Sequence, residues 1–289
     1  MNDNYINFRR QRELGEIISD TFKFIRENYK LLFRLIFKIA GPVFVVLVLA
    51  MGYYYYVVGY QPLMSNIFDF RPGEMILALI LMLVSFLGFF ALLQGTIFHY
   101  IKSYVENNGD VNPLQVRTGV KSDFGKILGV TLMTGVLVFI GLMLCILPGI
   151  YLWVPLSFAI PLVVFGRRES IDSMKDAFEL IRDNWWMTFI SLFIMALLMY
   201  LVSLIFQIPM FIYIFIKAFT VVQEGSAASP EMFIDWVYIV FSVISSLAQY
   251  LLYTILIIAI AFIYYSLDEK KNATGSLDTI SNLGSSDID

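Results

Sequence analysis

The sequence predicts an all-α, polytopic membrane protein with six transmembrane helices in three hairpins, each preceded by an amphipathic helix at the cytoplasmic surface. Hydrophobic residues make up 59% of the 289 residues and charged residues only 15%, which is far from a soluble composition. Several apolar runs exceed the roughly 18 residues that indicate a bilayer span. Charged segments precede the first, third and fifth of these runs. Together these observations exclude an ordinary soluble globular protein.

The three in-plane helices are expected at about 13–30, 113–121 and 169–184. In the first and third, apolar residues recur at three- and four-residue spacing and charged residues fill the opposite face. Asn112 and Pro113 mark the start of the second, because Asn caps helices and Pro suits the first helical position. A helix that still carries charges lies in the headgroup plane instead of crossing the bilayer.

The six spans are expected at about 35–58, 74–100, 124–146, 150–165, 188–208 and 236–264. With the in-plane helices they form a single membrane domain over residues 1–266. The basic residues 1–12 are expected to be mobile. Residues 267–289 are rich in Ser, Asp and Asn and are predicted to form a disordered cytoplasmic tail.

Prolines and glycines modify these spans. Pro42 lies near the start of the first span, where a membrane helix tolerates it. Pro155 and Pro161 predict a kinked or locally irregular fourth span, and Pro209 is expected to bend or end the fifth. Glycines 125 and 129 stand four residues apart in the third span, where they would let a second backbone approach closely.

Two segments have matching sequences. Asp20–Phe33 (DTFKFIRENYKLLF) and Asp176–Phe189 (DAFELIRDNWWMTF) share Asp, Phe, Ile, Arg, Asn and Phe at one constant offset. The match predicts repeat units, each an in-plane helix followed by a hairpin. Because an even number of spans separates the two segments, the repeat would be parallel, unlike the inverted repeats of many transporters.

The distribution of basic residues predicts the orientation. Six spans place both termini on one side, and 18 of the 20 Lys and Arg residues then fall on that side, leaving only Arg71 and Lys217 on the other. By the positive-inside rule both termini are cytoplasmic. The expected location is a bacterial inner membrane.

The run Leu147–Phe165 (LPGIYLWVPLSFAIPLVVF), followed by Ser170, Ala177-Phe178 and residues 181–186 (IRDNWW), carries a family resemblance. It resembles the membrane domain attached to some bacterial glycerophosphodiester phosphodiesterases and the stand-alone six-span relatives of that domain. The resemblance implies a polytopic membrane protein. It transfers no catalytic residue, because the phosphodiesterase chemistry of those relatives lies in a separate soluble domain.

The sequence offers little for catalysis, metals or cofactors. His99 is the only histidine and Cys145 the only cysteine, which argues against a multi-histidine metal site and an internal disulfide. No span has a central Asp, Glu, Lys or Arg, which argues against ion-coupled transport. We therefore predict no catalytic residue, no metal and no cofactor. A polar cluster around His99 would be needed to support an intramembrane enzyme.

One candidate surface is basic and aromatic, and it would bind anionic lipid or a cytoplasmic partner. Its residues are Arg26, Lys30, Arg167, Arg168, Lys175, Arg182, Trp185 and Trp186. Each basic residue near an anionic leaflet contributes about 1 kcal/mol. The alternative is that the third in-plane helix packs over span ends through an apolar face of Ile171, Met174, Phe178, Ile181 and Trp185.

A second candidate is a polar stripe. It consists of Gln94, His99, Ser242, Ser245, Ser246 and Gln249. The serines fall on one side of the sixth span and serve either helix packing or the lining of a pore.

The function predicted from the sequence is that of a non-catalytic integral membrane protein of the bacterial envelope that organises lipids or partner proteins. The alternative is a passive transporter or channel for a small or lipid-like solute. Membrane lipids and other envelope membrane proteins are the expected partners. The small net charge of −3 does not favour nucleic acid.

Overall fold

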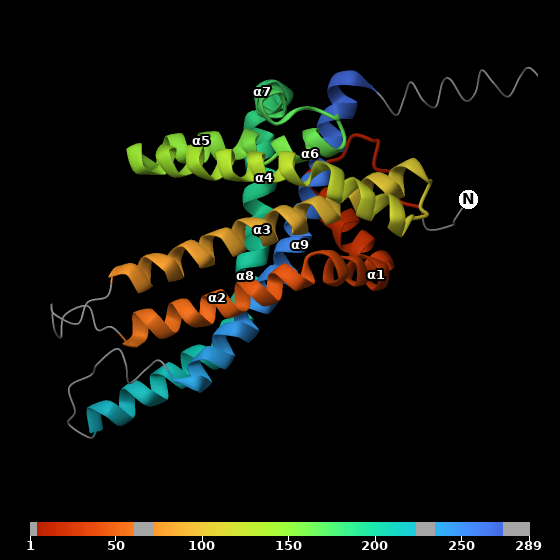
Figure 1. The fold of residues 1–289 in the computed structure, drawn as a ribbon. Helices are drawn as coiled ribbons and strands as arrows, with labels where there is room; N and C mark the ends of the chain where they lie inside the picture. The colour runs from red at the N-terminus through yellow and green to blue at the C-terminus, as the bar shows by residue number, and fades with distance from the viewer. Residues whose placement is uncertain (1–4, 61–71, 224–234, 274–289) are drawn as a thin grey trace, which may run out of the picture. The chain divides into compact units, whose positions relative to one another are not determined.

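A computed structural model describes residues 5–60, 72–223 and 235–273. Every regular element in these ranges is a helix (Figure 1). By length and composition, five helical segments are able to cross a membrane, or six if the bent pair α1 and α2 is one span. The all-α class, with several helices long and apolar enough to span a membrane, is therefore confirmed for the described residues. The elements are α1 (Leu14–Ile39), α2 (Gly41–Tyr60), α3 (Pro72–Glu106), α4 (Pro113–Leu144), α5 (Ile146–Leu156), α6 (Ala159–Val164), α7 (Ser170–Ile181), the 3₁₀ turn η1 (Arg182–Asn184), α8 (Trp185–Gln223) and α9 (Trp236–Asn272).

Helix α4 begins where the sequence predicts. The Asn112 side chain accepts hydrogen bonds from the backbone N–H groups of Leu114, at 3.0 Å, and Gln115, at 3.4 Å, and Pro113 is the first helical residue. The helix then continues without a break to Leu144. The surface helix predicted at 113–121 and the span predicted at 124–146 are thus one element.

Prolines interrupt the helices in two places. Helix α1 ends at Ile39 and α2 begins at Gly41, because Pro42 has no N–H to donate to the preceding turn and its ring crowds the carbonyl of Lys38. The predicted first span is therefore broken near its start. The fourth span consists of the two helices α5 and α6, which is the irregular form predicted from Pro155 and Pro161.

The third proline has a smaller effect. Pro209 lies inside α8, which runs on to Gln223 and so continues 15 residues beyond the predicted end at 208. The proline therefore does not end this helix. Neighbouring groups in a membrane helix can meet the carbonyl that a proline leaves free.

The prediction that residues 1–12 are mobile is wrong for residues 5–12. The Phe8 ring is fully buried, with its centroid 4.2 Å from that of Phe262 and 5.3 Å from that of Phe24. The Arg12 side chain has no exposed surface and donates to the Phe8 carbonyl oxygen at 2.7 Å. These residues form a strap, which we call the N-terminal strap, that joins α1 to α9.

Helix α9 also extends further than predicted. It ends at Asn272, and Leu267 and Glu269 are buried, so the tail predicted from residue 267 starts with helical residues. Residues 274–289, the rest of that predicted tail, lie outside the described residues. So do residues 61–71, which lie between the first two predicted spans.

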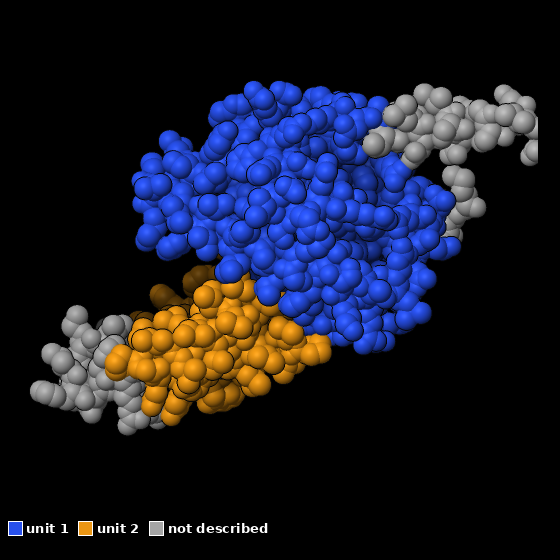
Figure 2. All heavy atoms as spheres, turned by 45° about the horizontal axis from the view of Figure 1, so that its top comes forward, with its two compact units in different colours: residues 1–40, 90–197, 254–289 blue, residues 41–89, 198–253 orange. Residues whose placement is uncertain are grey.

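The chain divides into two compact units, whereas the sequence predicts a single domain over 1–266 (Figure 2). Unit 1 contains residues 1–40, 90–197 and 254–289, and unit 2 contains residues 41–89 and 198–253. Unit 1 has an aromatic core in which Phe24 packs edge-on against Tyr104, at 5.1 Å, and Phe262, at 6.2 Å. Both candidate grooves described below belong to unit 1.

Unit 2 has its own aromatic and polar contacts. The rings of Phe44, Phe89 and Tyr250 pack with centroids 5.0–5.5 Å apart. Asp235, just before α9, accepts hydrogen bonds from Tyr213 and, at 2.6 Å, from Lys217. Partial burial raises the pKa of Asp235, but these hydrogen bonds outweigh that effect and lower the pKa to about 2.

Candidate functional site

Helices α4 and α5 form a tight hairpin that builds one wall of the site (Figure 1). Cys145 is the only residue between them. Gly149 permits the contact, because a Cβ atom there would lie 2.4 Å from Leu142 Cδ2. The close approach predicted at Gly125 and Gly129 is wrong, since a Cβ at Gly125 would meet nothing within 4 Å and one at Gly129 only Ser170 Oγ at 3.8 Å.

Helix α7 packs against α4, α5 and α6 and forms the opposite wall. Its start is fixed by an ion pair of 2.6 Å between Lys126 Nζ and Glu169 Oε1. The Ser170 hydroxyl donates to the Lys126 carbonyl oxygen at 3.3 Å. The buried residues of α7 are Ser173, Ala177, Leu180 and Ile181.

The buried face of α7 differs from the apolar face predicted from the sequence. Ile171 was expected on that face, but its side chain is 58% exposed. Small Ser173 and Ala177 occupy the contact instead, because they allow α7 to lie close to the neighbouring helices. Phe178 is thereby left half-buried at the edge of a groove.

The turn η1 leads into α8 and seats its first residue on α5. The Trp185 ring stacks on Tyr151, with centroids 5.6 Å apart, and on Phe189 at 5.3 Å. Trp186 packs edge-on against Trp185 at 4.9 Å, and its side chain is 70% exposed. A cluster of stacked aromatic rings thus lies at the start of α8, and Trp186 is its exposed member.

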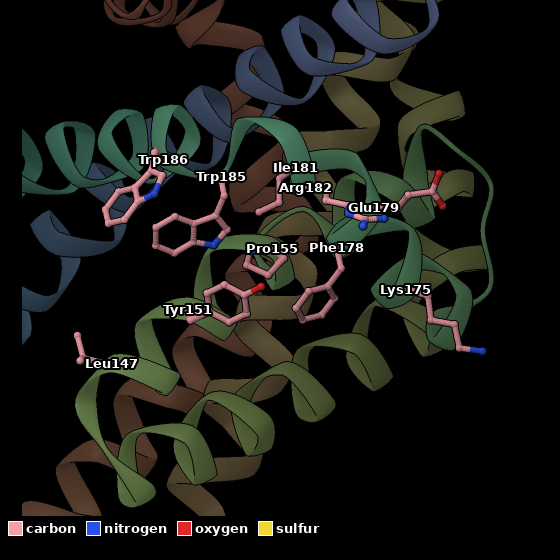
Figure 3. Close-up of a pocket in the computed structure, with 10 residues that line it drawn as sticks. All are labelled: Leu147, Tyr151, Pro155, Lys175, Phe178, Glu179, Ile181, Arg182, Trp185 and Trp186. Atoms are coloured by element: carbon pink, nitrogen blue, oxygen red, sulfur yellow. The ribbon is translucent and has the colours of Figure 1, made fainter.

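These elements enclose a groove of about 810 Å³, which we call the tryptophan groove (Figure 3). Leu147 and Trp186 lie toward one end in Figure 3, and Lys175 and Glu179 toward the other. The groove therefore has an apolar, aromatic part and a charged part. It is lined by Leu147, Tyr151, Pro155, Lys175, Phe178, Glu179, Ile181, Arg182, Trp185 and Trp186.

The charged end of the tryptophan groove carries excess positive charge. Glu179 forms an ion pair of 2.9 Å with Lys271, which offsets its negative charge. Lys175 and Arg182 are exposed and make no hydrogen bond or ion pair with any described residue. The buried Trp185 Nε1 likewise has no hydrogen-bond partner within the described ranges. The groove can therefore offer two cations to a ligand.

The structure divides the predicted basic and aromatic surface. Lys175, Arg182, Trp185 and Trp186 meet in the tryptophan groove. Arg168 instead pairs with Asp176 at 2.8 Å. Arg26 and Lys30 are exposed on α1 and line neither groove, and Arg167 lines a second groove.

The second groove lies beside His99 and has a volume of about 660 Å³. We call it the histidine groove. The His99 ring is buried, with Nε2 3.1 Å from Asp123 Oδ2. A Cβ at Gly119 would lie 2.4 Å from His99 Nδ1, so this glycine makes room for the ring. The groove is lined by His99, Lys102, Glu106, Asn112, Leu114, Gln115, Thr118, Gly119, Ser122, Asp123, Lys126, Val163 and Arg167.

Sequence reasoning missed Asp123 as a partner of His99. The available signal was the four-residue spacing of Gly119 and Asp123, which places a gap and a carboxylate on one helix face. That spacing does not reveal which helix faces them. Among the described residues, no group of three or more His, Cys, Asp and Glu side chains could hold a metal ion.

The polar stripe is distributed over both units. Gln94 and His99 belong to unit 1, whereas Ser242, Ser245, Ser246 and Gln249 belong to unit 2. The Ser245 hydroxyl donates to the Phe206 carbonyl oxygen of α8 at 3.2 Å, and Ser242 Oγ lies 3.9 Å from Met210 Sδ. Two of the serines therefore contact α8, as expected for helix packing.

In its described residues the protein is all-helical, with several helices long and apolar enough to cross a membrane. The chain matches no protein-family model, and comparisons with curated proteins and with solved structures also give no match.

Proposed function

We propose that this protein is a non-catalytic integral membrane protein of the bacterial inner membrane that binds an anionic phospholipid in the tryptophan groove and so organises lipid in the envelope. The observation that carries the proposal is the pairing of two cations, Lys175 and Arg182, with an aromatic wall in one groove. Anionic phospholipids present the same combination of a charged headgroup and an apolar chain.

The headgroup would bind at the charged end. Arg182 suits a phosphate because a guanidinium donates two parallel hydrogen bonds, and Lys175 adds a point charge. Glu179 does not cancel both cations, because Lys271 already pairs with it. The acyl chain would lie along Tyr151 and Trp186, whose exposed rings suit the boundary between headgroups and hydrocarbon.

The test compares two double variants with the same change in charge. Lys175→Gln/Arg182→Gln removes the groove cations, and Arg26→Gln/Lys30→Gln removes two exposed cations of α1. Native mass spectrometry of the purified protein should show that the first variant retains an anionic phospholipid about tenfold less than wild type, since each lost charged hydrogen bond is worth more than about 1 kcal/mol. The second variant should retain it as wild type does. Equal retention by both variants would refute the groove as the binding site.

We further propose six spans with both termini in the cytoplasm, which places the tryptophan groove at the inner leaflet. The 18-to-2 distribution of basic residues supports this orientation. In a Cys145→Ser background, cysteines at Gly73 and Gln223 should react with an impermeant thiol reagent in intact spheroplasts, and a cysteine at Asp172 should not. If only the cysteine at position 172 were labelled, the orientation would be the reverse of the one proposed.

We also retain the proposals of repeat units and of kinship with the six-span domains that the sequence resembles. The repeat is supported by a second pair of residues at the same offset. Arg12 Nε lies 2.9 Å from Asp20 Oδ2, and Arg168 Nε lies 2.8 Å from Asp176 Oδ2. Both helices α1 and α7 therefore start beside the same type of ion pair.

A passive transporter or channel is the second candidate, and the break between α5 and α6 favours it. Broken membrane helices occur where backbone lines a cavity or is covered by protein. Tracer flux into proteoliposomes above that of empty liposomes, across a panel of small and lipid-like solutes, would support this candidate. Flux no greater than in empty liposomes would exclude it for those solutes.

A further inference from the structure

Arg167, in the connection between α6 and α7, has an unusual backbone conformation. Its φ is 52°, in the left-handed region that favours glycine. Gly166 precedes it and is itself needed for space, because a Cβ there would lie 2.8 Å from the Leu162 carbonyl oxygen. The chain thus places its glycine at the crowded position and an arginine at the left-handed one, where a helix commonly ends in glycine.

This conformation carries the Arg167 side chain to the histidine groove, which it lines with Lys102 and Lys126. The other charged groups have partners. Lys102 donates to the Val164 carbonyl oxygen at 2.6 Å, and Lys126 pairs with Glu169 at 2.6 Å.

The carboxylates of the groove are also occupied. Asp123 lies beside His99 at 3.1 Å and accepts from the Ser122 hydroxyl at 3.1 Å. Glu106 accepts from the Gln115 amide at 2.6 Å. Both carboxylates of the groove therefore already have hydrogen-bonding partners other than Arg167.

Arg167 itself makes no hydrogen bond or ion pair with any residue that the structure describes. Its charge also repels that of Lys102. A strained arginine held near a like charge costs stability, and an anion between the two would reverse that repulsion.

We propose that the histidine groove binds a phosphate-type anion, with Arg167 as its principal partner. The guanidinium matches two phosphate oxygens in a bidentate contact. Lys102 and the Thr118 hydroxyl group line the same groove and are the other candidate donors. Leu114 and Val163 are its only large apolar lining residues, so the groove suits a phosphate group on a small polar molecule or a lipid headgroup, and not an acyl chain.

The first test measures phosphate binding to the full-length protein in detergent by isothermal titration calorimetry, with inorganic phosphate and methyl phosphate as probes. Arg167→Gln should weaken binding about tenfold or more, because it removes a bidentate charged contact. Arg117→Gln is the matched control, since Arg117 is exposed on α4 and does not line the groove. The proposal would be overturned if wild type bound neither of these probes nor phosphatidic acid. It would also be overturned if Arg167→Gln and Arg117→Gln bound the anion equally well.

The source of the phosphate is distinguished with nanodiscs. If the anion is a lipid headgroup, wild type in nanodiscs with phosphatidic acid should melt at a higher temperature than in phosphatidylcholine alone, and Arg167→Gln should lose that shift. If it is soluble, only inorganic or methyl phosphate should give a shift that depends on Arg167. The variant Lys175→Gln/Arg182→Gln should leave either shift intact, so this inference and the tryptophan-groove proposal can fail separately.

A second variant separates binding from folding. Glycine adopts a positive φ without strain, so Arg167→Gly without ligand should melt at the temperature of wild type or above it, and yet lose the phosphate-dependent shift. A lower melting temperature in both Arg167→Gly and Arg167→Gln would show that Arg167 holds the fold, and would overturn its assignment as a ligand-binding residue.

Discussion

The two matching segments, Asp20–Phe33 and Asp176–Phe189, differ mainly in what covers them. The first lies entirely within α1, and the N-terminal strap packs Phe8 against its Phe24. The second crosses α7, η1 and the start of α8, and it faces α5 across the tryptophan groove. The same amphipathic pattern therefore forms a helix covered by the strap in the first segment and a wall of the tryptophan groove in the second.

The two segments nevertheless bury equivalent positions. Thr21 and Ala177 are both buried, as are Phe24 and Leu180, and each pair is separated by the same offset. Their exposed residues differ in chemistry, with Lys30 in the first segment where the second has Trp186. The two segments thus bury the same positions although the residues there differ, and their exposed residues determine what each free surface can bind.

The strap can be tested directly by Phe8→Ala. This substitution removes a fully buried ring from the cover of the first segment and should lower the free energy of unfolding by about 3–5 kcal/mol. Thermal unfolding in detergent, followed by tryptophan fluorescence, measures the effect. Phe22→Ala is the control, because Phe22 is 44% exposed on α1, the helix that the strap covers, and it should cost clearly less. Equal losses would show that the strap does not stabilise α1.

The equivalent ion pairs should differ in strength. Arg12→Gln should destabilise the protein by about 3 kcal/mol, because the Arg12 side chain is fully buried and its removal leaves buried acceptors without a donor. Arg168→Gln should cost less than about 1 kcal/mol, because that side chain is 58% exposed. Denaturant unfolding of the two variants gives the comparison, and a larger loss for Arg168→Gln would contradict it.

The wall of the tryptophan groove depends on Gly149. Gly149→Ala places a methyl group 2.4 Å from Leu142 Cδ2, and the overpacking should cost about 1–3 kcal/mol. Gly135→Ala, on α4 with nothing within 4 Å of the added Cβ, should be neutral or slightly stabilising. Melting temperatures of both variants test this contrast. If Gly149→Ala and Gly135→Ala have the same melting temperature, the close contact between Gly149 and Leu142 does not hold α5 against α4.

The smallest effect is expected for Trp185→Phe. The indole N–H has no partner in the described part of the chain, and a phenyl ring can still stack on Tyr151 and Phe189. The free energy of unfolding should therefore change by less than about 1 kcal/mol. A larger loss in chemical denaturation would mean that the indole N–H makes a stabilising hydrogen bond.

Much of the helical layout is predictable from local sequence. Composition predicts the all-α membrane class, Asn112 and Pro113 predict the start of α4, and Pro155 and Pro161 predict the broken fourth span. These features depend on hydrophobicity and on backbone chemistry within a few residues. Local patterns are therefore sufficient for them.

The features that the sequence did not predict depend on contacts between residues far apart in the chain. Phe8 lies in a polar, basic stretch, and only its packing against Phe262 at 4.2 Å makes the strap ordered. The His99 and Asp123 side chains come from different helices, and the contact at Gly149 depends on how α5 folds back on α4. Periodicity identifies the faces of a helix but does not say which helix each face meets.

The candidate residues were likewise predicted only in part. Lys175, Arg182, Trp185 and Trp186 were selected from the sequence, and they do line one groove. Tyr151 and Leu147 on α5 complete that groove and were not selected, because the packing of α5 beside α7 is not encoded in either segment alone.

The most direct test of the central proposal is photo-crosslinking with an anionic phospholipid that carries a photoreactive group in its acyl chain. Adducts in proteoliposomes should concentrate on Tyr151 and Trp186, should decrease with excess unlabelled anionic lipid, and should be lost in Lys175→Gln/Arg182→Gln. Adducts spread evenly over the exposed apolar surfaces of the helices, and unchanged in that variant, would contradict the proposal that the tryptophan groove holds a specific lipid.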